Sequence, residues 1–205
     1  MIRVTDISLP VDHKPEELGQ AIAAIMGVPA HEIRSYEIYR KAVDARKRDH
    51  ICFVYSVDVD SRRETAILER LGKKGNVSPM PQAKYQLPPR TKTDDGSRPV
   101  VIGAGPCGLF AGLILAQMGM RPVILERGKS AKERTRDVQA FWRSGTLDTE
   151  SNVHFGEGGA GTFSDGKLTT QIKDQAGRCR KVIDELIAAG ATEEIGFWYK
   201  PHIGT

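Results

Sequence analysis

The chain has 205 residues, of which 40% are hydrophobic and 27% charged, with 21 glycines and 11 prolines. This length and composition exclude a disulfide mini-protein, a chain disordered throughout and a collagen-like repeat. Thirty Lys and Arg stand against 26 Asp and Glu, so the formal charge is +4, which is too small and too evenly spread for a nucleic-acid-binding arm. The sequence has no apolar run of about 18 residues and no signal-peptide pattern at its start. We therefore expect a cytoplasmic protein without a membrane partner.

The cysteines and histidines do not form a metal-binding or redox pattern. Cys52, Cys107 and Cys179 lie far apart, so they make neither a disulfide framework nor a CxxC pair. No histidine pair has ligand spacing, and we expect no metal site. His154 and His202 are the histidines best placed for acid-base chemistry, although a histidine in such a position is more often a hydrogen-bonding loop residue. The catalytic residues and the oligomeric state stay unassigned.

Residues 1–72 alternate between strand-like and helix-like patterns. Residues 2–9, 33–42 and 51–59 predict three strands, the last two joined as a hairpin. Residues 15–27 carry apolar side chains at helical spacing between Pro15 and Gly27, which predicts a helix. Ser61 and Glu64 have the spacing of a capping box, so a second helix is predicted to start at Ser61. The order β-α-β-β-α predicts a small ferredoxin-like domain in an α/β chain.

A proline-rich segment separates this domain from a different kind of sequence. Residues 73–98 contain few apolar residues and show no period, which predicts a linker or an extended arm. The segment PVVIG that follows is a short apolar strand of the type found in parallel sheets. We therefore place the start of a Rossmann-type domain at residues 99–205.

The strand is followed directly by a glycine turn, a helix and a second strand. Gly103, Gly105 and Gly108 stand in GxGxxG register, and Glu126 ends the second strand. In a dinucleotide site the first glycine permits a tight turn, the second lets the backbone approach a pyrophosphate, and the third lets the helix pack closely. The helix N-terminus faces the anion, and the acid accepts hydrogen bonds from ribose hydroxyls. These spacings predict a dinucleotide site but do not separate NAD from FAD.

Two further signals follow the second strand. Ser130 and Glu133 predict a capped helix, on which Arg134 is expected to lie on the solvated face, with a contact to a cofactor phosphate as the alternative. From Gly156 to Lys167, glycine and alanine make up half of the residues. Such a stretch brings backbone amides close to a flat or anionic ligand, although a surface loop would explain it equally well.

The segments GAGPCGLFAGLILAQMGMRPVILERG and SNVHFGEGGAGTFSDGKL together resemble flavoproteins of the glutathione-reductase-like FAD fold. They are most similar to bacterial FAD-dependent dehydrogenase-like proteins, which carry a small N-terminal domain ahead of the flavin domain. The stretch YRKAVDARKRDHICFVYSV resembles a segment of that N-terminal domain. The resemblance implies FAD as the cofactor and NAD(P)H as a candidate electron donor.

The resemblance also implies which residues contact FAD. Gly103, Gly105, Pro106, Cys107 and Gly108 would contact the pyrophosphate. Glu126 and Arg127 would lie at the adenosine ribose. The side from pyrophosphate to flavin would be lined by a set from the glycine-rich stretch: Gly158, Gly159, Ala160, Gly161, Thr162, Ser164, Asp165 and Lys167. Lys167 is also a candidate to stabilise negative charge on a reduced flavin.

The leading functional hypothesis is an FAD-dependent oxidoreductase that transfers hydride between the flavin and an unidentified small organic substrate. Proteins of the resembled family are much longer, so we expect this chain to be an inactive N-terminal fragment that retains FAD weakly or not at all. The alternative is an RNA- or protein-binding module with a non-catalytic nucleotide fold. The basic stretch Arg40–Arg48 favours that alternative, whereas no glycine-bearing signature of RNA-binding strands surrounds Phe53 and Tyr55, so a nucleic-acid partner is disfavoured. A plain NAD-binding domain is a third hypothesis, which the glycine-rich stretch after residue 155 disfavours.

Overall fold

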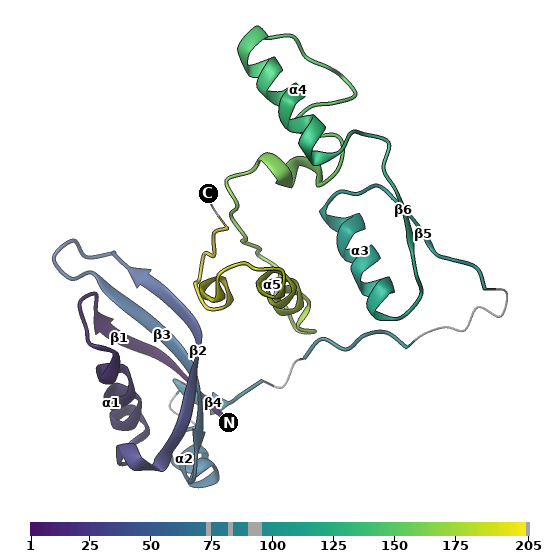
Figure 1. The fold of residues 1–205 in the computed structure, drawn as a ribbon. Helices are drawn as coiled ribbons and strands as arrows, with labels where there is room; N and C mark the ends of the chain where they lie inside the picture. The colour runs from purple at the N-terminus through teal and green to yellow at the C-terminus, as the bar shows by residue number, and fades with distance from the viewer. Residues whose placement is uncertain (73–74, 82–83, 90–95, 204–205) are drawn as a thin grey trace. The chain divides into compact units, whose positions relative to one another are not determined.

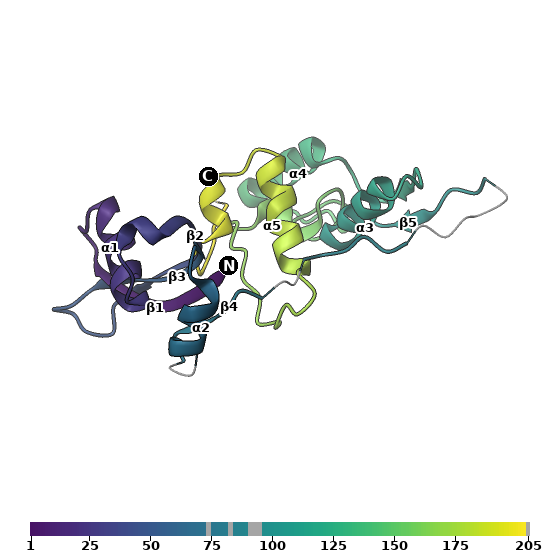
Figure 2. The same ribbon diagram turned by 90° about the horizontal axis from the view of Figure 1, so that it is seen from below.

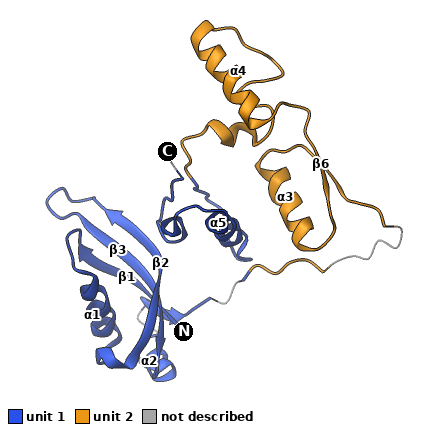
Figure 3. Ribbon diagram, viewed as in Figure 1, with its two compact units in different colours: residues 1–84, 168–203 blue, residues 85–167, 204–205 orange. Residues whose placement is uncertain are grey.

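The computed structural model describes residues 1–72, 75–81, 84–89 and 96–203. These form two compact units (Figure 3): Met1–Lys84 together with Leu168–Ile203, and Tyr85–Lys167. The first unit holds a four-stranded antiparallel sheet, and the second holds a two-stranded parallel sheet. The fold class is therefore mixed α/β, whereas the domain limits at residues 72 and 98 stay predictions. No helix in the described ranges is long and apolar enough to cross a membrane.

The first unit is built on a sheet with strand order β2-β3-β1-β4 (Figure 1). Its elements are β1 (Ile2–Pro10), α1 (Pro15–Met26), β2 (Ile33–Asp44), β3 (Cys52–Ser61), α2 (Glu64–Leu71) and β4 (Val77–Pro79). Each β-α-β connection passes over one intervening strand, as in the split β-α-β arrangement. The predicted β-α-β-β-α order is thus present, with one strand added after it.

One hydrophobic core joins the helices to the sheet. Alternate residues of β1 and β3 face the apolar stripes of α1 and α2, because successive side chains of a strand point to opposite faces. α1 ends at Gly27, whose left-handed backbone (φ +60°) terminates the helix as predicted. The buried residues of this core are Ile2, Val4, Ile7, Leu18, Ile22, Met26, Tyr55, Val57, Val59, Ile67, Leu71 and Val77.

The short strand β4 lies inside the segment 73–98 that the sequence pattern assigns to a linker. Its backbone pairs antiparallel with β1, with Val77 opposite Val4. Val77 is 1% exposed and belongs to the core. The strand forms because β1 needs a partner for its outer backbone groups, a requirement that is not visible in the local sequence.

The predicted start of α2 at Ser61 is wrong. Ser61 is the buried last residue of β3, and the helix begins at Glu64 after Arg63 with no side-chain cap. Glu64 does not complete a capping box; its carboxylate accepts hydrogen bonds of 2.8 and 2.9 Å from the N-terminal amine of Met1. The sheet register carries the strand two residues beyond its predicted end, so tertiary pairing overrides the local capping signal.

Residues 168–203 pack with the first unit. They form α5 (Arg178–Ala188) and a 3₁₀ turn (Glu193–Gly196), followed by a stretch that pairs with the edge of β2. Lys41 N donates to Phe197 O (2.7 Å), and Tyr199 N donates to Lys41 O (2.8 Å). The Lys41 ammonium also lies 4.7 Å from the centroid of the Trp198 ring. Backbone pairing and cation–π contact together fix this segment to the sheet edge.

The second unit contains a parallel β-α-β arrangement (Figure 1; Figure 2 shows β5 and α3 from below). β5 (Val100–Ile102) and β6 (Val123–Leu125) pair in parallel, and α3 (Pro106–Gln117) packs against both. α4 (Ala131–Ser144) follows, and its start confirms the predicted capping box between Ser130 and Glu133. A 3₁₀ turn over Gly159–Phe163 lies in the glycine-rich stretch.

Candidate functional site

The first part of the site is the glycine turn between β5 and α3. Gly103 adopts a left-handed backbone (φ +97°), and its amide donates to Leu125 O at 2.7 Å, which joins the turn to β6. A Cβ on Gly108 would lie 1.8 Å from Gly103 O, so the close helix approach requires glycine there. α3 begins at Pro106 after Gly105 without a side-chain cap. The first amides of α3 are therefore left to a ligand or solvent, and the positive end of the helix dipole favours an anion.

Glu126 closes the turn from the end of β6. Its Oε2 accepts a hydrogen bond from Ala104 N and its Oε1 from Gly128 N, both at 2.7 Å. These two backbone donors hold the pKa of Glu126 below its usual value. The carboxylate therefore stays ionised, and because it has about four acceptor positions, two remain for further donors. That arrangement suits a pair of ribose hydroxyls and repels a phosphate.

The structure brings the two glycine stretches together. Gly158 N donates to Ala104 O at 2.8 Å. A Cβ on Gly159 would lie 3.2 Å from Pro106 Cδ and 3.3 Å from Gly105 Cα. A Cβ on Gly128 would lie 2.4 Å from the Cα of Gly156. Backbones approach this closely only without side chains, so the glycine-rich stretch is not a free surface loop.

Arg134 of α4 holds the glycine-rich stretch through its guanidinium. It is predicted on a solvated helix face, yet it is fully buried (0% exposed), so that prediction is wrong. Its guanidinium donates to Asn152 O and Gly159 O at 3.0 Å, and also to Glu157 O. None of the carboxylates that the structure describes forms an ion pair with it. The residue is buried because the loop folds back onto α4, which the period of α4 does not reveal.

A cavity of about 180 Å³ lies where these segments meet. Four of the predicted site residues line it: Gly105, Glu126, Arg127 and Gly159. Five further residues line it that were not predicted as cofactor contacts: Gly128, Glu150, His154, Phe155 and Gly156. Arg127 and Glu150 form an exposed ion pair of 3.3 Å. The sequence does not indicate that Glu150 and Phe155 lie close to Glu126, because they follow it by more than twenty residues.

The other predicted residues lie beside this cavity. Cys107 is exposed in the first turn of α3. Thr162 accepts a hydrogen bond of 3.3 Å from Arg134, so it supports the loop. Asp165 and Lys167 form an exposed ion pair of 2.7 Å, which raises the pKa of Lys167. The remaining predicted contacts lie at the start of α3 (Pro106 and Gly108), in the turn before it (Gly103), and in or next to the 3₁₀ turn (Gly158, Ala160, Gly161 and Ser164).

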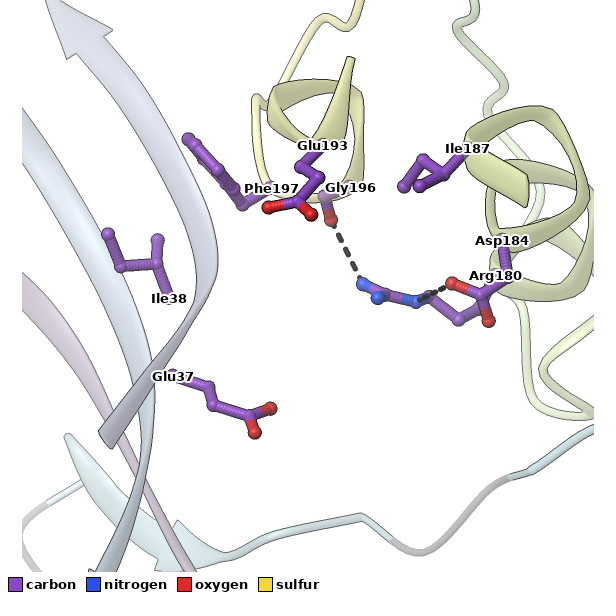
Figure 4. Close-up of a pocket in the computed structure, with 8 residues that line it drawn as sticks. All are labelled: Glu37, Ile38, Arg180, Asp184, Ile187, Glu193, Gly196 and Phe197. Carbon is purple, nitrogen blue, oxygen red and sulfur yellow. Dashed lines mark hydrogen bonds and ion pairs between the residues drawn. The ribbon is translucent and has the colours of Figure 1, made fainter. Parts of the chain in front are cut away.

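The first unit holds a separate cavity of about 480 Å³ beside β2 and α5 (Figure 4). Arg180 donates to Asp184 Oδ1 (2.8 Å) and Gly196 O (3.0 Å) at its edge. Glu37 and Glu193 add two carboxylates to the lining. Three carboxylates against one guanidinium disfavour a phosphate ligand, and no predicted site residue lies there. Among the described residues, no group of three or more His, Cys, Asp or Glu is placed to hold a metal ion.

The comparisons with known proteins agree with this geometry. The sequence model of the FAD binding domain matches residues 98–151, which include the glycine turn, Glu126 and α4. A model of a domain of unknown function (DUF8436) matches residues 1–60. A protein of Clostridium beijerinckii, named only as an uncharacterized protein, is 42% identical over 204 residues. That alignment covers 100% of this chain but 38% of the relative, so the chain spans well under half of the relative's length.

Proposed function

We propose that this chain carries the FAD-binding start of a flavin-dependent oxidoreductase that acts on a small organic substrate. The observation that carries the proposal is the contact between the glycine turn at Gly103–Gly108 and the stretch at Gly156–Gly161. Both lie in or beside the region matched by the FAD binding domain. The residues fit a dinucleotide, because they combine uncapped helix amides, an ionised carboxylate and close backbone approach.

The residues have separate tasks in this proposal. The start of α3, with Gly105 and Cys107, binds the pyrophosphate through backbone amides. Glu126 accepts hydrogen bonds from the ribose. Gly159, held by Arg134, keeps the second stretch against the turn and excludes water from the phosphates. When bound, FAD supplies hydride acceptance and donation. Reduction of the flavin by NAD(P)H is part of the proposal for the whole protein.

Two features lead us to set aside the RNA-binding alternative. Tyr55 is 2% exposed in the core of the first unit, so its ring offers no face to a base. Lys41 and Arg40 are engaged in cation–π contacts with Trp198 and Tyr199. Tyr55 and two of the basic residues in Arg40–Arg48 are thus already engaged within the first unit.

The proposal is tested by titrating the isotope-labelled chain with FAD and following its backbone amides by NMR. We expect saturable shifts clustered at Gly103–Gly108 and Glu126, with weak affinity for the chain alone. FMN, which lacks the adenosine half, should bind less tightly than FAD. Gly105→Ala is the matched variant, because its Cβ enters space that is open in the free chain and should block the pyrophosphate. Absence of saturable shifts at the turn, or equal affinity for FMN, would contradict the proposal.

A further inference from the structure

The cavity beside Glu126 has one wall that the proposed phosphate and ribose contacts do not use. With Gly105 assigned to the pyrophosphate and Glu126 to the ribose, the remaining side chains of the lining are two charged residues and two rings. The charged residues, Arg127 and Glu150, pair with each other at 3.3 Å. The rings belong to His154 and Phe155.

These rings are accessible. Phe155 is 50% exposed although it is large and apolar, and the two ring centroids lie 6.4 Å apart with a tilt of 60°. An exposed phenyl ring that lines a cavity next to a ribose-binding carboxylate offers a flat apolar surface to a base. The volume of about 180 Å³ is below the ~300 Å³ of pockets that enclose whole drug-sized ligands. It suits one part of a larger ligand.

The wall is held from beneath rather than being part of a loose loop. Asn152 is 6% exposed, and its Oδ1 accepts a hydrogen bond of 2.9 Å from His154 N. Its Nδ2 donates to Asp148 O at 2.9 Å, and its main-chain oxygen accepts from Arg134. Because Arg134 also binds Gly159 O, one buried cation fixes both the ring-bearing turn and the phosphate-facing loop. The backbone of the turn that carries the two rings is thereby held in place by hydrogen bonds within the protein.

We infer that His154 and Phe155 form the subsite for the adenine base of the nucleotide, with Phe155 as the stacking surface. This inference rests on the proposed function. It gives His154 a binding role in place of the acid-base role considered from the sequence. It also makes Phe155 the main contact that favours a purine over a smaller pyrimidine ring.

The test uses ADP as the probe, because ADP carries the base, ribose and pyrophosphate without the flavin. Binding to the 205-residue chain is measured by titration, and saturation-transfer difference NMR reports which ligand protons touch the protein. We expect strong transfer to the adenine protons and tighter binding of ADP than of UDP. Phe155→Ala should weaken ADP about tenfold, as for loss of one stacked base, and should erase the preference over UDP. Phe155→Tyr keeps the aromatic face and should restore both.

Trp142→Ala is the matched control, since Trp142 is an exposed aromatic residue (66%) of α4 that does not line the cavity. It should leave ADP binding and the transfer pattern unchanged. If ADP binds with shifts at Gly103–Gly108 but Phe155→Ala leaves its affinity and adenine transfer intact, the adenine assignment is overturned while the proposed function stands. Failure of ADP to bind the unaltered chain at all would overturn both.

Discussion

The two sheets of this chain differ in how much of their own apolar surface they bury. In the four-stranded sheet, Ile2, Val4, Val57 and Val59 are all 0% exposed. In the two-stranded sheet Ile102 is 87% exposed, and α3, although apolar on all sides, buries only Gly112 among its residues. Burial of apolar surface is the main stabilising term in folding. The first sheet is therefore stabilised by its own buried apolar core, whereas the second unit buries little apolar surface around its glycine turn.

The same contrast is seen in two arginines, Arg3, whose side chain is 14% exposed, and Arg134, which is 0% exposed. Arg3 forms a two-pronged ion pair with Asp58, with both distances at 2.8 Å, and its guanidinium stacks on Tyr39 at 3.3 Å. Arg134 is bound by main-chain oxygens and Thr162. On the sheet, the charge of Arg3 is neutralised by Asp58. In the second unit, the guanidinium of Arg134 instead holds the backbone at Asn152 and Gly159 in place. Burial of a cation is costly unless it is hydrogen-bonded, and the main-chain oxygens of Asn152 and Gly159 supply such bonds to Arg134.

The largest expected difference between the units is in hydrogen exchange. Amides of β1 and β3 should exchange only on global unfolding, at about 5 kcal/mol or more. Amides of β5 and β6 should exchange through local opening at about 2 kcal/mol or less, because few apolar contacts hold them. Residue-resolved exchange by NMR measures both. Equal protection of the two sheets would break the comparison.

A substitution at the tightest point of the glycine turn should have the next largest effect. Gly108→Ala places a Cβ 1.8 Å from Gly103 O, and we expect it to destabilise the second unit by about 3 kcal/mol through overpacking and to abolish FAD binding. Gly105→Ala, with φ at −72° and open space around its Cβ, should change stability by about 0.5 kcal/mol or less yet still block FAD. Exchange rates of β5 and β6 report stability, and titration reports binding. If both variants keep their exchange rates, the turn is less tightly packed than its geometry indicates.

Removal of the buried arginine should loosen both loops of the site. Arg134→Met removes the guanidinium that donates to Asn152 O and Gly159 O, and we expect a loss of about 3 kcal/mol in the second unit. Arg136→Met, at an exposed position of the same helix, is the control and should cost about 0.5 kcal/mol or less. Denaturant unfolding followed at amides of Asn152 and Gly159 measures the difference. A similar small effect of both substitutions would show that Arg134 does not hold the loops.

A smaller effect is expected from the two helix starts, one in each unit. Ser130→Ala removes an observed capping box and should cost about 1 kcal/mol. Ser61→Ala removes a residue with capping spacing that does not cap; its Oγ lies 3.4 Å from Arg63 N. We expect less than about half of the Ser130 effect there. Chemical denaturation of each variant measures the two losses of stability. A larger loss for Ser61→Ala than for Ser130→Ala would support the helix start at Ser61 that the sequence pattern predicts.

The smallest effect is the pH dependence contributed by Glu126. Its backbone hydrogen bonds lower its pKa in the folded chain, so its stabilising contribution is present above the unfolded value of about 4.3. That contribution is lost as the pH falls through the lower folded value. The difference in Tm between the unaltered chain and Glu126→Gln should therefore shrink on acidification below about pH 4. A constant difference across this range would mean that the two amides do not favour the ionised form.

The sequence by itself determined the features that depend on neighbouring residues. The apolar period of α1, the alternation of β1 to β3, the box at Ser130 and the glycine turn are local, because each reflects backbone geometry over a few residues. The tertiary structure alone decided the partner of β1 at Val77, the true start of α2 and the burial of Arg134. It also brought Phe155 beside Glu126 in one cavity. These depend on backbone groups and charges finding partners tens of residues away, and such long-range pairing leaves no period in the chain.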